Sequence, residues 1–141
     1  MKDIFNIIPI LLFLIVGFIS LKMAFKCLFS KKILPFHEKA SGKLWNEFED
    51  PVKILILALM RLTGIGFLVT SVLLIVFPIY NYFIPNIFYK YSIPVIALIF
   101  CTGLFLINYI LYKKTKAETP WKGSLIAIIV IIAGMIISFF N

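Results

Sequence analysis

Acidic side chains are scarce in this chain of 141 residues, which has six aspartates and glutamates against fourteen lysines and arginines. Charged residues of both signs make up only 14% of the sequence, about half of their usual share. Apolar residues account for 62%, whereas a small soluble domain buries only about two-thirds of its surface. The composition therefore excludes an ordinary soluble domain and predicts that lipid is part of the solvent.

Histidine and cysteine are too few for a metal centre. His37 is the single histidine, and the pattern H-E-K-A-S that it begins lacks the second histidine of a zinc-binding H-E-x-x-H helix. Cys27 and Cys101 are expected at different depths, too far apart for a disulfide, and we interpret them as small packing residues. The sequence also has no glycine-rich phosphate loop, nucleophile elbow or catalytic triad. It therefore predicts no metal, no cofactor and no recognisable enzyme.

Long apolar runs, in contrast, occur four times. We predict a four-transmembrane-helix bundle, an all-α single membrane domain covering residues 1–141. The four predicted helices cover residues 4–25, 51–77, 93–112 and 123–140. The second is expected to begin after Asp50 with Pro51 in its first turn, and to stop at Pro78.

Lysines predict the orientation of these helices. They gather in the predicted loops 26–50 and 113–122, whereas the other side has only Lys2 and Lys90. The positive-inside rule places lysine-rich loops in the cytoplasm, which leaves both termini outside. In the first cytoplasmic loop, Leu44, Trp45 and Phe48 fall on one side of a short helix, which predicts an interfacial segment on the inner leaflet.

Small residues recur at helical spacing in each apolar run, and we interpret them as packing surfaces, because close backbone approach holds helices together in lipid. The alternative is a cavity lined by these faces. The residues are Gly17, Ser20, Ala24, Thr63, Gly66, Thr70, Ala97, Cys101, Asn108, Gly123, Ala127, Gly134 and Ser138.

Arg61 is the one cation inside the second predicted helix, about ten residues from its start. A charge at membrane depth needs a partner, and the planar guanidinium of arginine suits an oxyanion. The alternatives without a ligand are a side chain that snorkels to the headgroups or a structural ion pair. We expect Arg61 to point into the cytoplasmic mouth of the bundle and to contact an acid, a carbonyl or a tryptophan from a loop.

Other polar and aromatic residues are predicted at the same inner boundary, so we expect any site to open inward. The candidate ligand-binding residues are His37, Glu38, Trp45, Arg61, Tyr112, Glu118 and Trp121. A solvated histidine, helix-capping acids and interfacial aromatic anchors are the structural alternatives for these residues.

Four segments of the sequence resemble a family of small bacterial membrane proteins with four helices. The shared pattern is a Pro-aromatic-His segment, a tryptophan, a basic residue before a glycine-rich helix centre, and Thr-Pro-Trp. Here these are residues 35–37, Trp45, 57–68 and 119–121. The resemblance implies the same fold and a place in the bacterial cytoplasmic (inner) membrane, but no particular activity.

We predict a non-enzymatic membrane protein whose inner polar cluster binds a lipid headgroup, a small ligand or a partner protein. One alternative is a membrane enzyme acting on an amphiphile, with His37 or Glu38 as base and Arg61 as anion clamp. Another is an accessory subunit of a transporter or channel. The expected partners are membrane lipids, together with a membrane protein or a second copy of the chain. Nucleic acid is not expected, because the lysines lie at the ends of apolar segments.

Overall fold

A computed structural model describes residues 2–140, with side chains from residue 7 onward. All regular elements in this part of the chain are helices, so the predicted all-α class is confirmed there. The long helices are α1 (Lys2–Phe29), α3 (Asp50–Phe83), α4 (Ile87–Thr115) and α5 (Trp121–Phe139). Two short elements, α2 (Pro35–Ser41) and the 3₁₀ turn η1 (Trp45–Glu47), connect α1 to α3. The side chain of Lys2, used above for the orientation, lies outside the described residues.

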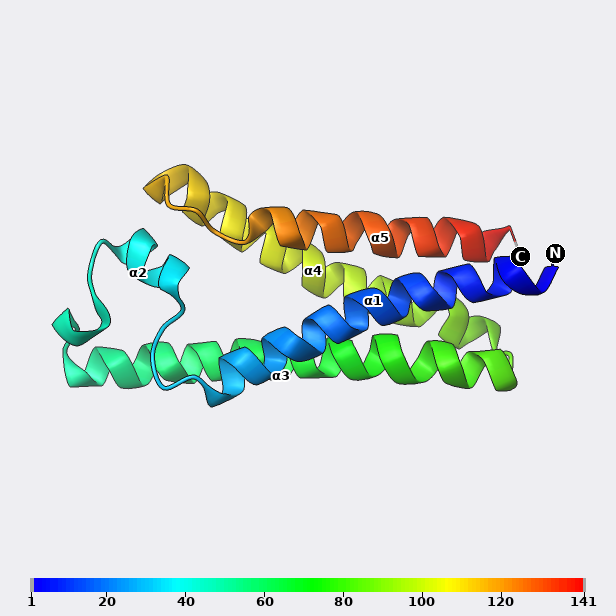
Figure 1. The fold of residues 1–141 in the computed structure, drawn as a ribbon, viewed down its shortest axis with the longest axis horizontal. Coiled ribbons are helices and arrows are strands. Elements are labelled where there is room, and N and C mark those ends of the chain that lie inside the picture. The colour runs from blue at the N-terminus through cyan, green and yellow to red at the C-terminus, as the bar shows by residue number, and fades with distance from the viewer. Residues whose placement is uncertain (1, 141) are drawn as a thin grey trace.

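The long helices run antiparallel to their neighbours. Helix α1 packs against α3 and α5, and α4 packs against α5 and α3 (Figure 1). The two termini lie at one end of the molecule, together with the turn between α3 and α4 (Figure 1). The other end, which we call the lysine-rich end, holds α2, η1 and the loop between α4 and α5. The four apolar runs were sufficient to predict which loops share an end of the molecule, because the chain reverses its direction between successive long helices.

The helices are longer than the apolar runs suggested. The prediction that the second long helix stops at Pro78 is wrong, since α3 continues to Phe83. Pro78 lies inside α3 and Pro94 inside α4, which begins at Ile87. A proline inside a helix removes one backbone hydrogen bond and kinks the helix, whereas ending the helix would leave several backbone groups unpaired. Continuation is therefore the less costly solution in an apolar environment.

Two apolar clusters hold the helices together. The first joins all four long helices and consists of Phe13, Val16, Leu74, Ala97, Cys101 and Ile131. The second lies towards the lysine-rich end, where Cys27 and Met60 meet Leu34 of the loop before α2, with Phe36 packed against them. The first loop is thus anchored by its apolar side chains, as expected for an ordered segment. Its anchor is Leu34 and Phe36, however, whereas Leu44 is exposed.

The small residues predicted to pack are mostly in contact with neighbouring helices. Gly17, Ser20 and Ala24 are buried on α1, and Gly134 and Ser138 are buried on α5. Gly123 is an exception, because it is exposed. Two buried hydroxyls of α3 bond to their own helix: Thr70 donates to the Gly66 carbonyl at 2.9 Å and Ser71 to the Leu68 carbonyl at 2.7 Å. Each bond pairs a polar group for which lipid offers no partner.

Large apolar side chains cover the outside of all four long helices. Each of these helices is long and apolar enough to cross a membrane. A soluble monomer does not expose apolar surface on this scale. The coarse prediction of a multi-pass membrane protein is therefore consistent with the structure.

Candidate functional site

Glu38 connects the two short elements at the lysine-rich end. Its Oε1 accepts a hydrogen bond from the backbone N–H of Trp45 at 3.1 Å, which holds η1 against α2. Helix α2 ends at Gly42, whose φ of 67° lies in the left-handed region that glycine tolerates. The chain can therefore turn back sharply enough for Glu38 to reach Trp45. This geometry gives Glu38 a structural role, because its carboxylate already has a partner.

A salt bridge links α2 to the loop between α4 and α5. Lys39 Nζ lies 3.5 Å from Glu118 Oε2, and both side chains are largely exposed. Exposed pairs of this kind contribute little stability. The loop itself is fixed more firmly by Thr119, whose hydroxyl donates to the Asn108 carbonyl at 2.8 Å. Glu118 therefore stays available to solvent at this end of the molecule.

Trp121 is surrounded by aromatic rings at the start of α5. Its ring centroid lies 5.9 Å from that of Tyr112 and 5.7 Å from that of Tyr109. Lysines approach the same group, with Lys122 Nζ 5.7 Å from the Trp121 ring and Lys113 Nζ 5.7 Å from the Tyr109 ring. Aromatic rings beside cations are typical of a membrane–water interface. This group is suited to anchoring α4 and α5 at headgroup level.

His37 lies in α2 at the lysine-rich end, and its pKa is shifted by burial. Its ring is half-buried, 4.0 Å from the Phe36 ring centroid to centroid, and Nδ1 is buried without a hydrogen-bond partner among the described residues. Burial lowers the pKa of His37 below its ordinary value of 6.5, because the charged imidazolium loses hydration. The folded position of α2 therefore favours the neutral form of the His37 ring.

Acid should loosen the docking of α2. In the undocked segment, His37 takes up a proton near its ordinary pKa, whereas in the docked segment it does so only at lower pH. The docked state of α2 is therefore most stable above the undocked pKa of His37, and its stability falls as the pH decreases. We expect protease cleavage within residues 31–49 of the lipid-embedded protein to accelerate between about pH 7.5 and about pH 5.5. His37→Phe keeps an apolar ring but cannot titrate, so it should remove most of this acceleration. An equal acceleration in His37→Phe would assign the effect to another group, such as Glu38.

Arg61 does not take part in the predicted cluster. Its side chain is exposed, and it forms no salt bridge or hydrogen bond with the described residues, so the predicted contact with a loop acid, carbonyl or tryptophan is not formed. The helical register explains this orientation. Arg61 shares its face with Ile54 and Ile65, which are also exposed, whereas Met60 and Gly64 are buried.

The end of α1 gives a reference level for Arg61 along α3. A Cβ at Gly64 would lie 2.9 Å from Leu28 Cγ, so Gly64 packs against the last turn of α1. Arg61 precedes Gly64 by one turn and so lies level with the end of α1 at Phe29, where Lys31 and Lys32 follow. Helix α3 extends about 16 Å beyond that level, at about 1.5 Å per residue. This position fits the alternative in which Arg61 snorkels to headgroups, and its depth in a membrane stays a prediction.

The lysine-rich end also has a shallow cleft of about 340 Å³ beside α2. Glu38, Lys39 and Lys43 line it, together with Pro35, Gly42, Leu44 and Glu47. The seven sequence-predicted candidates do not form one cluster. Glu38 lies at this cleft and holds Trp45, Glu118 is linked to α2 through Lys39, and Tyr112 and Trp121 belong to the aromatic group. Among the described residues, no hydrogen bond or salt bridge joins Arg61 to His37 or Glu38, so these contacts do not support the enzyme alternative built on the three residues. No group of three or more potential metal ligands occurs among the described residues.

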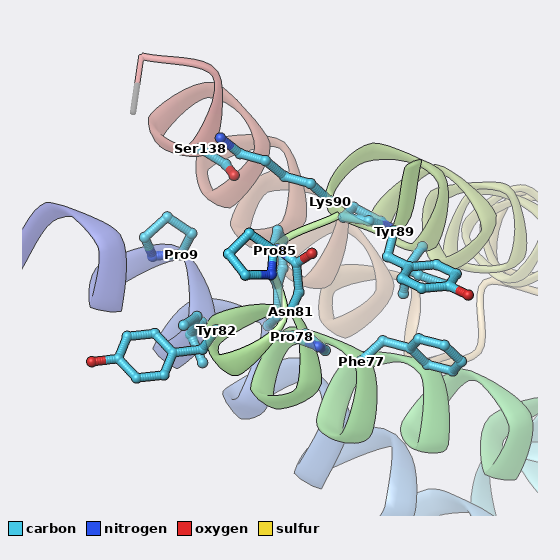
Figure 2. Close-up of a pocket in the computed structure, with 13 residues that line it drawn as sticks. Pro9, Phe77, Pro78, Asn81, Tyr82, Pro85, Tyr89, Lys90 and Ser138 are labelled. Carbon is cyan, nitrogen blue, oxygen red and sulfur yellow. The ribbon is translucent and has the colours of Figure 1, made fainter. Parts of the chain in front are cut away.

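A second cavity, which the sequence did not predict, lies at the end that holds the termini. It measures about 310 Å³ and is formed by α1, α3, α4, α5 and the turn between α3 and α4 (Figure 2). It lies at the opposite end from the sequence-predicted candidates, and the expectation that any site opens inward stays a prediction. The prolines in the apolar runs were the sequence feature that could have indicated this cavity, since Pro9, Pro78 and Pro94 all line it.

No family model, curated protein or solved structure matches the chain. The family resemblance stays a prediction, and the class of protein rests on the fold: a helical chain with four candidate membrane spans.

Proposed function

We propose that this chain is a four-span protein of a bacterial cytoplasmic membrane, forming a single membrane domain whose lysine-rich end lies in the cytoplasm and binds anionic lipid headgroups. Charge distribution carries the proposal. Twelve of the fourteen basic residues lie at or near the lysine-rich end, with five of the six acids, which leaves an excess of seven positive charges. They are Lys22, Lys26, Lys31, Lys32, Lys39, Lys43, Lys53, Arg61, Lys113, Lys114, Lys116 and Lys122.

Most of these cations are free to meet lipid. Within the described residues, only Lys39 and Lys53 form salt bridges. These twelve basic residues, which we call the lysine collar, are spread over the ends of the four long helices and over both loops. A lysine near an anionic membrane surface contributes about 1 kcal/mol, so the lysine collar favours anionic over neutral lipid. Lipid headgroups fit this arrangement better than a small ligand, because the charges do not converge on one pocket.

The proposed orientation follows from the same asymmetry. Reporter fusions at the C-terminus and within loop 113–116 test it. The orientation fails if the C-terminal fusion reports the cytoplasm and the loop fusion reports the outside.

The lipid preference is tested on a triple variant in which Lys113, Lys114 and Lys116 are replaced by glutamine. These side chains are exposed at the end of α4, so the fold should tolerate their loss. We expect native mass spectrometry of the purified protein to show at least about tenfold less retained phosphatidylglycerol, because three surface charges are worth about 3 kcal/mol before salt screening. Phosphatidylcholine retention should not change. Equal loss of both lipids, or of neither, would contradict headgroup binding by this collar.

A further inference from the structure

The cavity at the end holding the termini is built from parts of the chain that are distant in sequence. Its rim includes Tyr82 and Pro85, which are exposed, and its floor includes Phe13, Ile93 and Ser138, which are buried. The space therefore runs from the helix ends into the interior of the bundle. At about 310 Å³ it lies at the lower end of the range of about 300–1,000 Å³ typical of ligand sites.

Prolines interrupt the helical hydrogen bonding beside this cavity. Pro78 cannot donate to the carbonyl of Leu74, and Pro94 cannot donate to the carbonyl of Lys90, so each carbonyl loses its helical donor. Both prolines line the cavity. Interrupted helical hydrogen bonding at membrane depth is tolerated where it borders a cavity or a partner group, and in transporters such helices form binding sites.

Among the described residues, Lys90 is the one charged residue that lines the cavity. Its side chain crosses from α4 toward Ser138 on α5 (Figure 2). Its Nζ lies 5.6 Å from the Tyr91 ring, and it forms no salt bridge with the described residues. A half-buried ammonium group beside apolar walls favours an anion, and no carboxylate from residues 7–140 lines the cavity with it.

Asn81 supplies a second donor. Its Oδ1 accepts a hydrogen bond from the backbone N–H of Asn86 at 2.7 Å, which fixes the side chain at the turn between α3 and α4. The amide nitrogen of Asn81 is then the group left to donate to a ligand. Tyr82 and Tyr89 also line the cavity, with their hydroxyls directed away from its centre (Figure 2). Cationic and neutral donors thus accompany an apolar floor.

We propose that this cavity binds an anionic amphiphile with a single acyl chain, the headgroup at Lys90 and Asn81 and the chain against Phe13 and Ile93. The charge selects an anionic head, and the small volume selects one chain over the two of a phospholipid. A fatty acid and a lysophospholipid share this chemistry. The site is separate from the lysine collar of the proposed function, because it lies at the opposite end of the helices and uses none of its cations.

The test adds oleate, lysophosphatidylglycerol or oleyl alcohol to the purified full-length protein and counts bound molecules by native mass spectrometry. We expect at least one of the two anions to bind, and oleyl alcohol to bind at least about tenfold more weakly, because a hydrogen bond to a charged group is worth about one to two powers of ten in affinity. Lys90→Gln should weaken anion binding to the level of the alcohol. The relative affinities of oleate and lysophosphatidylglycerol identify the source of the headgroup.

Asn81→Asp is the sharper variant. It preserves the acceptor for the Asn86 N–H but adds a negative charge to the lining of the cavity, so anion binding should be lost while the unfolding temperature stays close to that of the wild type. The lysine-collar triple variant is the matched control and should bind oleate normally, whereas Lys90→Gln should retain phosphatidylglycerol normally. Equal binding of oleate and oleyl alcohol, unchanged anion binding in Asn81→Asp, or no bound amphiphile at all would overturn the proposal. Because each variant should affect lipid binding at its own end only, the two controls show whether the proposal for the lysine collar, the proposal for the cavity or both are wrong.

Discussion

Leu74→Ala is expected to lower the free energy of unfolding by about 2–3 kcal/mol, whereas the same substitution at Leu62 should change it by less than about 0.5 kcal/mol. Both leucines lie on α3. Leu74 is 0% exposed in the cluster that joins all four long helices, and Leu62 is 64% exposed on the outside. The comparison therefore changes burial and keeps residue type and helix constant.

The expected cost at Leu74 comes from lost packing and not from contact with water. Lipid chains are as apolar as leucine, so burial inside a membrane bundle gains little from the hydrophobic effect. A truncated Leu74 instead leaves a cavity whose walls lose their dispersion contacts, and such a space is too enclosed for lipid to fill. At Leu62, a lipid chain can occupy the vacated volume. Reversible unfolding in mixed micelles measures both variants, and equal losses would show that α3 is not packed as described.

The sequence was sufficient to predict that four long helices form and where their apolar centres lie, because four apolar runs separated by lysine or aromatic segments leave few alternatives, but not where α3 ends or α4 begins. It did not predict how α3 is rotated about its axis. A helix that is apolar on all sides has no amphipathic pattern to show which face is buried. Arg61 was therefore assigned to the interior on grounds of electrostatic cost alone, whereas the packing of Met60 and Gly64 turns it outward.

The candidate site was predictable only where local contacts decide it. Glu38 and Trp45 are seven residues apart, and their hydrogen bond depends on a turn that Gly42 makes possible. The cavity at Lys90 depends on four helices meeting, which no single segment encodes. Pro78 was interpreted as a helix end, and the prolines of the other runs were not considered, so their common position on one cavity became visible only in three dimensions.

Gly17→Ala should destabilise the protein by about 1–3 kcal/mol, because the space it would need is already occupied. A Cβ at Gly17 would lie 2.7 Å from Ile75 Cγ1, 3.3 Å from Leu74 Cβ and 3.4 Å from the Leu74 backbone carbonyl carbon. Ile75 is β-branched, so its Cγ1 cannot easily rotate away, and the Leu74 atoms belong to the rigid stem of α3. Separation of α1 from α3 is then the available relief.

Gly103→Ala is the matched control, since nothing lies within 4 Å of a Cβ built at Gly103. Alanine is the better helix former by up to about 1 kcal/mol, so this variant should be as stable as the wild type or more stable. Ile75→Ala removes the atom that meets the new methyl group. The double variant Gly17→Ala/Ile75→Ala should therefore be more stable than the sum of the two single changes predicts, with a coupling of about 1 kcal/mol measured in a double-mutant cycle. Additive losses would mean that Gly17 acts through some other contact, because a steric clash relieved by removing its partner must appear as coupling between the two sites.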